Sequence, residues 1–298
     1  METILDFFTN PYYIQVLTIT GIYLIAALGL NLITGVTGQF SFGHAAFMSI
    51  GAYTAALLGL KLHTPFLVNL LLGGTAAAAA GLLLGYPSLR LTGDYLGITT
   101  LGFGEIVRVV FINLEITGGA RGLAGIPRET DILIVGIIVV LAILAMYLIN
   151  HSRFGRALLA IREDEIAAET MGINALAYKI KSFMIGAFFA GVSGGLYAHL
   201  MQYLNPADFG FTKSFDLLNF VVLGGLGSIP GTILGTTVLQ LAPEFLRFVK
   251  EYRMLIYGGL MVVMMIFRPY GLLGGVAFKD VKRLMSLFKP KTTAGCSR

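Results

Sequence analysis

Two ionisable side chains inside an apolar segment, Glu105 and Arg108, are the clearest candidates for chemistry in this sequence. Side chains at positions i and i+3 share one face of a helix, so the carboxylate and the guanidinium can meet. Charge within a membrane is costly and usually faces a helix bundle or a water-filled path. The pair is therefore either a gate or coupling element of a transport path, or a mutually neutralised structural pair near the membrane surface.

A second group of polar side chains, Gln39, Ser41 and His44, lies beside a glycine-containing break in the helical pattern. Uncharged polar groups beside a helix break suit a small zwitterionic solute or a water-lined path. The alternative is hydrogen bonding between helices, which contributes about 0.6 kcal/mol on average in lipid. The candidates for a translocation path, drawn from both regions, are Gly38, Gln39, Ser41, His44, Thr99, Thr100, Phe103, Glu105 and Arg108.

The sequence shows no recognisable set of catalytic residues. The four His residues are scattered, with no spacing that places two of them on one helical face as metal ligands. No Ser-His-Asp arrangement is legible. A glycine-rich stretch that begins at Gly225 lacks the Lys of a phosphate-binding loop. We expect no catalytic residue, no metal site and no cofactor in this chain.

Composition indicates a membrane protein. Of the 298 residues, 56% are hydrophobic and 12% are charged, whereas soluble domains carry roughly 25% charged residues. The net charge of +5 lies in loops and in the C-terminal tail. This is the positive-inside distribution and does not indicate a nucleic-acid-binding surface. The single Cys296 excludes a disulfide framework, and the N-terminus lacks the basic region of a cleavable signal peptide.

The order of apolar segments predicts an all-α polytopic fold of roughly eight or nine membrane helices of about 20 residues, some broken or re-entrant. The uninterrupted segments are Ile14–Thr34, Ala45–Leu60, a span that Pro65 opens and that ends near Gly85, Ile132–Ile149, Phe183–Met201 and Met254–Phe267. The small residues from Ala76 to Gly81 favour close helix approach in lipid. The pattern breaks at Gly38–His44, within Asp94–Leu114 at Thr99–Gly104, and within Leu217–Leu241. Paired broken helices are typical of transporters built from repeats.

The longest polar interruption is the segment Gly155–Lys181. Its middle, Glu163–Gly172, is predicted to be a short helix, because acidic residues in the first turn suit the positive end of the helix dipole. Gly172 suits a left-handed cap at its end. Ile166, Ala167 and Met171 can share one face of this helix. Two interpretations stay open, a solvated loop helix and a helix that docks against another protein.

Charge distribution orients the second half of the chain. The Gly155–Lys181 segment and the tail are both basic, so both are expected in the cytoplasm, with an even number of crossings between them. Three simple spans do not satisfy this parity, so Leu217–Leu241 is either a re-entrant hairpin or part of two separate spans. Both alternatives place a chain reversal at membrane depth, which requires cover from protein or a cavity. The helix-break residues are Gly224, Gly225, Gly227, Pro230 and Gly231.

A series of different short motifs extends along nearly the whole chain. The first half carries Gly38–Phe47 with Gly51–Thr54, Gly93–Leu101 with Gly104–Arg108, and Thr117–Gly119 with Gly122–Leu123 and Gly125–Pro127. The second half carries Gly155–Leu158 with Ala160–Arg162, Leu223–Gly231 and Arg268–Leu272. In this order the motifs resemble the LivM-type permeases, the family of membrane subunits of branched-chain amino acid ABC importers.

The resemblance implies a partner set and a role for the polar segment. It implies a second, LivH-like permease, two cytoplasmic ATPase subunits that bind ATP and magnesium, and an extracytoplasmic solute-binding protein. Permeases of ABC importers carry a cytoplasmic loop in which an Ala pair precedes a Gly and which docks into the ATPase. Ala167-Ala168 and Gly172 match that loop, with Ile166 in place of its usual Glu. The residues implied in coupling are Gly155, Arg156, Arg162, Glu163, Ala167, Ala168 and Gly172.

The resulting expectation is a permease domain over residues 1–275, with its coupling segment at 151–182, and a basic cytoplasmic tail over residues 276–298 in the cell membrane. Branched-chain amino acids are the expected substrates. Urea, amides and aromatic acids are alternatives within the same importer class. A stand-alone secondary transporter would need coupling charges in its spans, for which Glu105 and Arg108 are the candidates. A membrane-embedded enzyme would need a catalytic cluster that the sequence does not show.

Overall fold

The structure is a computed structural model that describes residues 11–245 apart from positions 90 and 92, together with the isolated positions 258, 259, 262 and 271. The predicted span Met254–Phe267 and the basic tail lie outside this description. Within it, six helices are long and apolar enough to cross a membrane. Two shorter helices, α10 and α11, occupy the split segment Leu217–Leu241. These eight elements are compatible with the expected eight or nine.

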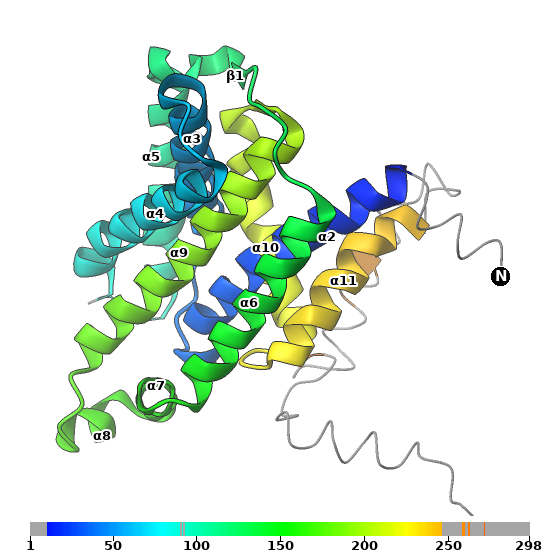
Figure 1. Ribbon diagram of the computed structural model, residues 1–298. Helices are drawn as coiled ribbons and strands as arrows, with labels where there is room; N and C mark the ends of the chain where they lie inside the picture. The colour runs from blue at the N-terminus through cyan, green and yellow to red at the C-terminus, as the bar shows by residue number, and fades with distance from the viewer. Residues whose placement is uncertain are drawn as a thin grey trace, which may run out of the picture.

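The long helices follow the predicted order. They are α2 (Pro11–Leu30), α3 (His44–Leu62), α4 (Phe66–Ser88), α5 (Asp94–Asn113), α6 (Ile132–His151) and α9 (Ala175–Met201). Helices α3, α4 and α9 pack side by side on one flank of the bundle, and α2 lies between α9 and α6 (Figure 1). Three of the largest fully buried side chains, Tyr53, Phe47 and Phe183, come from α3 and α9, and most of the others come from α2 and η1.

The remaining elements are short helical turns and strands in the connections, two helices of the coupling segment, and the helices α10 and α11. They are η1 (Asn31–Val36), η2 (Glu115–Thr117), η3 (Gly119–Arg121), β1 (Leu123–Ala124), α7 (Arg153–Glu163), α8 (Glu165–Thr170), β2 (Tyr203–Leu204), η4 (Pro206–Phe209), α10 (Phe211–Gly224) and α11 (Ile229–Phe245). Helices α7 and α8 lie at one end of the bundle and β1 lies at the other (Figure 1). Strand β1 pairs antiparallel with β2, which joins the loop after α5 to the loop after α9.

Two of the three predicted breaks are present. Helix α2 continues into η1, a π-helical turn, and residues 37–43 separate η1 from α3. Gly225 and Gly227, both with positive φ, form the turn between α10 and α11. The third prediction, an interruption at Thr99–Gly104, is wrong, because α5 runs unbroken from Asp94 to Asn113. The hydroxyls of Thr99 and Thr100 donate to carbonyls of the preceding turn, at 2.8 Å each, so both hydroxyl protons are satisfied within the helix.

Small residues set the distance between α3, α4 and α9. A Cβ added at Gly191 of α9 would lie 2.5 Å from the Cβ of Ala77 and 2.8 Å from the carbonyl oxygen of Gly73, both on α4. The same glycine faces the backbone of Gly51 on α3. Backbones approach this closely in lipid only where side chains are small. The expectation for the Ala76–Gly81 run of α4 is thus confirmed at Ala77, which is fully buried.

Replacing Gly191 by Val should therefore destabilise the bundle by about 1–3 kcal/mol, because the added atoms cannot be accommodated without moving a helix. Gly136→Val is the matched control, since Gly136 also lies within a membrane helix but has no atom within 4 Å of its added Cβ. Thermal unfolding of the detergent-solubilised variants measures the difference. Equal melting temperatures for the two variants would contradict the packing described here.

Candidate functional site

The predicted coupling segment folds as two helices rather than one. Helix α7 begins after Ser152, whose hydroxyl accepts a hydrogen bond from the Gly155 N–H at 3.2 Å. Its apolar face is buried through Gly155, Ala157, Leu158 and Ile161. Gly155 belongs in that face because a side chain there would collide with the carbonyls of Ile149 and Asn150. Arg156 lies on the opposite, exposed face and reaches only the His151 carbonyl, at 3.3 Å.

The predicted single helix Glu163–Gly172 is wrong at its start. Asp164 has extended backbone angles, ends α7 and caps α8 by accepting from the Ala167 N–H at 3.0 Å. Glu163 therefore closes α7, while Glu165 occupies the first turn of α8. Short acidic side chains favour such capping positions over helix interiors. The sequence contains a signal for this cap. Asp164 is a short acidic residue in a polar stretch, and it stands three residues before Ala167, whose N–H its side chain accepts from.

The end of α8 agrees with the prediction. Gly172 has a φ of +83°, and its N–H donates to the Glu169 carbonyl at 2.9 Å, while the Ile173 N–H donates to the Ala168 carbonyl at 3.1 Å. This pair of bonds is the Schellman arrangement that glycine favours. Ala168 is buried in a small apolar cluster with Ile161 and Ala175. Ile166 and Met171, by contrast, are 77% and 83% exposed.

An ion pair ties α8 to α9. The Lys179 ammonium lies 2.5 Å from a carboxylate oxygen of Glu165, and the Lys179 side chain is only 9% exposed. Together with the buried Ala168, this pair fixes the inner face of α8 against the bundle. The outer face of α8 is accessible and presents the apolar side chains of Ile166 and Met171 among exposed polar residues.

The structure brings the coupling segment and both helix breaks together at Arg162. The Arg162 guanidinium donates to the carbonyl of Gly35, in the π-helical turn η1. Gly38, with a φ of +78°, lies against the Arg162 side chain, where an added Cβ would be 3.1 Å from its Cγ. A Cβ added at Gly227, in the second break, would lie 3.2 Å from an Arg162 nitrogen.

Asn31 completes this junction, although the sequence analysis missed it. Its side-chain oxygen accepts a hydrogen bond from the Gly227 N–H at 2.8 Å, and the residue is 2% exposed. The bond links the first break directly to the second. The available signal was a single amide side chain within the otherwise apolar run Ile22–Ile33. Ser228, also missed, accepts from the Gly231 N–H at 3.2 Å and caps α11 beside Pro230.

The second break depends on its glycines. Gly224 and Gly231 meet backbone to backbone, so the ends of α10 and α11 cross without intervening side chains. Gly225 and Gly227 have φ values of +117° and +81°. Side chains would strain both positions. All five predicted break residues thus lie at the α10–α11 crossing or in its turn.

The polar residues of the first break separate into two kinds. His44 is fully buried, with its Nε2 3.0 Å from the Ala26 carbonyl, and Thr100 accepts from the Phe42 N–H at 3.0 Å. These two hold the break in place. Gln39 Oε1 and Ser41 Oγ are also buried, yet each has no hydrogen-bond partner among the described residues.

The α5 candidates divide between the interior and the surface. Phe103 packs on Phe47, with ring centroids 5.6 Å apart. Glu105 and Arg108 form the predicted ion pair, at 2.7 Å, with side chains about one-third exposed. The pair is therefore half-buried, like Thr99, and lies at the edge of the exposed, apolar face of α5, with the Arg108 side chain beside Gly210. The structure does not place it with Gln39, Ser41 and His44.

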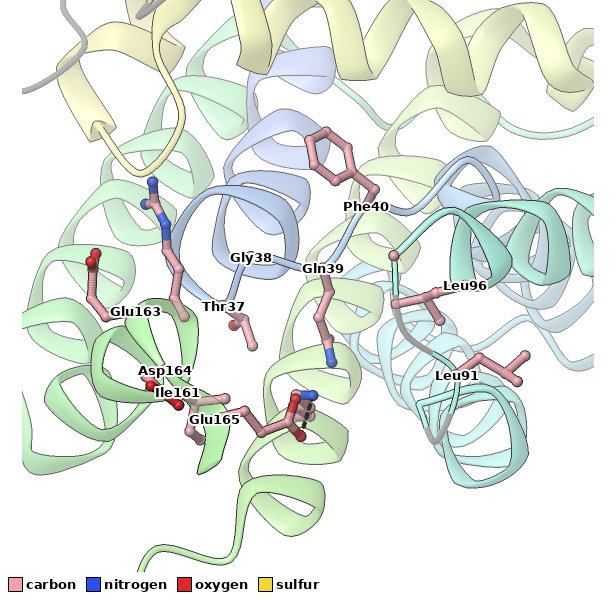
Figure 2. A pocket seen from close by; sticks show the side chains of 13 residues that line it. Thr37, Gly38, Gln39, Phe40, Leu91, Leu96, Ile161, Glu163, Asp164 and Glu165 are labelled. Carbon is pink, nitrogen blue, oxygen red and sulfur yellow. Dashed lines mark ion pairs between the residues drawn. The ribbon is translucent and has the colours of Figure 1, made fainter. Parts of the chain in front are cut away.

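A cavity of about 250 Å³ opens between the first break and the coupling segment. Its lining comes from three places in the chain: the break, the start of α5, and the α7–α9 region. Figure 2 shows Gln39 extending toward the ion-paired carboxylate of Glu165, while Phe40 turns away. The lining residues are Thr37, Gly38, Gln39, Phe40, Leu91, Gly93, Leu96, Ile161, Arg162, Glu163, Asp164, Glu165 and Lys179.

Replacing Asn31 by Leu should destabilise the α10–α11 turn, because the buried Gly227 N–H would lose its acceptor at a cost of about 1–3 kcal/mol. Hydrogen exchange of the amides in residues 225–228 is the measurement, and faster exchange is expected. Asn113→Leu is the control, since that amide lies at the exposed end of α5 and bonds only to its own helix. Unchanged exchange in the Asn31 variant would contradict the proposed link.

Comparison with known proteins gives a consistent result. The family model described as "Branched-chain amino acid transport system / permease component" matches residues 12–265. The permease protein LivM of Salmonella typhimurium is 41% identical over 295 residues, which cover 87% of this chain and 69% of that protein. LivM of Escherichia coli is also 41% identical. LivH of Escherichia coli is 27% identical over 86% of this chain and 92% of that protein.

A solved structure supports the fold alone. The complex "PsaBC from Streptococcus pneumoniae in complex with Fab" contains a chain that superposes with a TM-score of 0.50 at 14% sequence identity. The alignment covers 94% of this chain and 99% of that chain. The matched family model spans most of the sequence and includes both helix breaks and the coupling segment, so this chain belongs to the branched-chain amino acid transport permease family.

Proposed function

We propose that this chain is one permease subunit of an ATP-driven importer that moves branched-chain amino acids into the cell. The observation that carries the proposal is the family match over residues 12–265, in a chain whose coupling segment contacts both helix breaks through Arg162. The relatives are multi-pass permease proteins named for high-affinity branched-chain amino acid transport. Transport rather than catalysis is the function of such a subunit.

The outer face of α8 supports docking of a separate ATPase. Ile166 and Met171 are long apolar side chains that stand exposed on a polar segment at one end of the bundle. Apolar residues in such a position favour contact with another protein. We propose that two ATPase subunits bind ATP and magnesium and that one of them receives α8, and that an extracytoplasmic binding protein delivers the substrate.

A second permease fits the exposed side of α5. Helices α5 and α6 are similarly exposed, with only 22% and 17% of their most apolar window buried. Helix α6 is almost wholly apolar and suits lipid, whereas α5 carries Thr99, Glu105 and Arg108. Polar side chains at membrane depth usually face protein or a water-filled path. We propose a LivH-like partner against α5, with the translocation path between the two permeases.

Orientation follows from the positions of the helix ends. The end that carries α7 and α8 would be cytoplasmic, in the cell membrane of a bacterium or archaeon, and the β1–β2 end would be extracytoplasmic. The α10–α11 turn meets Arg162 near the cytoplasmic end, so α10 and α11 together descend and return. A reversal of this kind would satisfy the even number of crossings that the charge distribution requires. The last predicted span and the tail lie outside the described residues.

The mechanism transmits ATPase motion through the Arg162 junction. Closure of the ATPase dimer would move α8, and α7 would follow because Asp164 alone separates the two helices. Arg162 would carry this motion to the Gly35 carbonyl and to the turn at Gly227. The two breaks lie at the ends of α2 and α10, so the helices that flank the path would tilt together.

Substitution of the exposed docking face should uncouple the importer. Met171→Asp is expected to abolish ATP-driven leucine uptake in proteoliposomes, because it places a charge in an apolar contact. Capture of leucine by the binding protein should be unaffected. Met171→Leu keeps the apolar contact and should transport normally. Normal uptake by Met171→Asp would exclude α8 as the docking helix.

Arg162→Gln should reduce uptake about tenfold, since loss of a charged hydrogen bond costs roughly 1.5–3 kcal/mol and about 1.4 kcal/mol corresponds to tenfold. ATPase subunits should still co-purify with the permease, because the Arg162 guanidinium is directed at the Gly35 carbonyl within this chain. Arg153→Gln is the control, an exposed cation in the first turn of the same helix. If both variants transport at the same rate, Arg162 does not transmit the motion.

A further inference from the structure

We propose that the cavity between the first helix break and the coupling segment is a regulatory site for a free branched-chain amino acid on the cytoplasmic side. Occupation of this site would hold α8 in place and slow import. The choice of ligand rests on the proposed function, whereas the existence of the site rests on the geometry of the cavity. The volume of about 250 Å³ suits a small metabolite, because pockets for drug-sized ligands run from roughly 300 to 1,000 Å³.

The cavity contains a polar group that has no partner. Gln39 lies in its lining, is only 5% exposed, and its Oε1 has no hydrogen bond within the described part of the chain. An unsatisfied buried amide oxygen costs about 1–3 kcal/mol. Its side chain extends into the space in front of Glu165 (Figure 2). A ligand with an N–H donor at this point would remove the penalty.

Charge in the lining favours a zwitterion over a simple anion. Two cations, Arg162 and Lys179, face three consecutive carboxylates, Glu163, Asp164 and Glu165. The Arg162 guanidinium already donates to Gly35, and Asp164 already caps α8. The Lys179–Glu165 pair is left to receive a ligand. An α-carboxylate would bind the Lys179 ammonium, and an α-ammonium would bind the Glu165 carboxylate and Gln39 Oε1.

The remaining lining is aliphatic and matches the other end of such a ligand. Leu91, Leu96 and Ile161 contribute apolar surface, and both Leu96 and Ile161 are nearly fully buried. A polar corner beside an aliphatic wall is the arrangement that a branched-chain amino acid requires. Glycine or a charged amino acid would leave the wall unfilled or desolvate a second charge against it.

Inhibition follows from where the ligand would bind. The ion pair between Glu165 and Lys179 joins α8 to α9. A zwitterion placed between Glu165 and Lys179 would replace that contact with two ion pairs and add a bond to Gln39 in the first break. The ligand would thus cross-link α8, α9 and the break, which are the parts that must move during coupling. Accumulated product would slow its own import.

The experiment uses the complete importer in proteoliposomes, with ATP and a varied concentration of leucine on the ATPase side and labelled leucine with the binding protein on the other. Uptake is expected to fall about tenfold as leucine on the ATPase side saturates the site. Isovalerate, which lacks the ammonium, and leucinol, which lacks the carboxylate, should inhibit only at much higher concentration. Equal inhibition by all three compounds would overturn recognition of a zwitterion.

Two variants locate the effect, each compared with its own uptake rate without leucine on the ATPase side. Gln39→Leu removes the unpartnered amide, and Leu96→Phe fills the aliphatic end of the cavity, so both should abolish the inhibition. Ser41→Ala is the matched control, because Ser41 Oγ is equally buried and unpartnered but does not line the cavity. Inhibition that persists in Gln39→Leu and Leu96→Phe would place the site elsewhere.

Failure of the site and failure of the proposed function give different results. If the importer carries leucine but leucine on the ATPase side neither slows uptake nor binds the purified permease–ATPase complex in calorimetry, the regulatory site is excluded and the transport function stands. If the importer carries no branched-chain amino acid at all, the function itself is wrong. Calorimetry with leucine in the absence of the binding protein then tests the cavity independently.

Discussion

The structure depends on one constraint, that backbone polar groups at membrane depth must find partners within the protein. Two helices of this chain break inside the bundle, and each break would leave such groups exposed to an apolar surrounding. Asn31 and Gly227 lie 196 residues apart in sequence, yet the first break satisfies a backbone group of the second, because the Asn31 side-chain oxygen accepts from the Gly227 N–H. The Arg162 guanidinium, from the coupling segment, donates a hydrogen bond to the carbonyl of Gly35. The transmission of motion proposed above would therefore use the same few hydrogen bonds that stabilise the two breaks.

The helices around this junction pack closely against one another. Helices α3, α4 and α9 meet through glycine and alanine, so their backbones approach closely and a larger side chain would separate them. On the other side, Gly155, Leu158 and Ile161 of α7 are buried against the bundle. The cavity beside Gln39 lies at this end of the bundle, between the first break, the start of α5 and the α7–α9 region.

Most of the helical framework could be predicted from sequence because apolar length and glycine clusters are local properties. The bounds of α3 and α6 to within two residues, the C-terminal end of α9, the Gly172 cap and the break at Gly224–Gly231 follow from such signals, whereas α9 begins at Ala175, eight residues before the predicted Phe183. The Thr99–Gly104 interruption failed because threonine hydroxyls bond back to their own helix and glycine is tolerated in membrane helices. The Asn31–Gly227 and Arg162–Gly35 contacts were out of reach, since pairing over such a sequence distance has no local pattern. The exposure of Glu105 and Arg108 also required the packing of α5 to be known.

The polar surface of α5 has a consequence for the life of the chain in the cell. A subunit made in excess of its partner would present Glu105, Arg108 and Thr99 to lipid, where each is poorly solvated. Binding of the partner stabilises only the assembled state, so the folded fraction of this subunit would follow the partner's concentration by mass action. Unassembled subunits would unfold more often and would therefore be degraded by membrane proteases more often. The stoichiometry of the importer would thus be enforced by degradation of unassembled chains, without any dedicated regulator of synthesis.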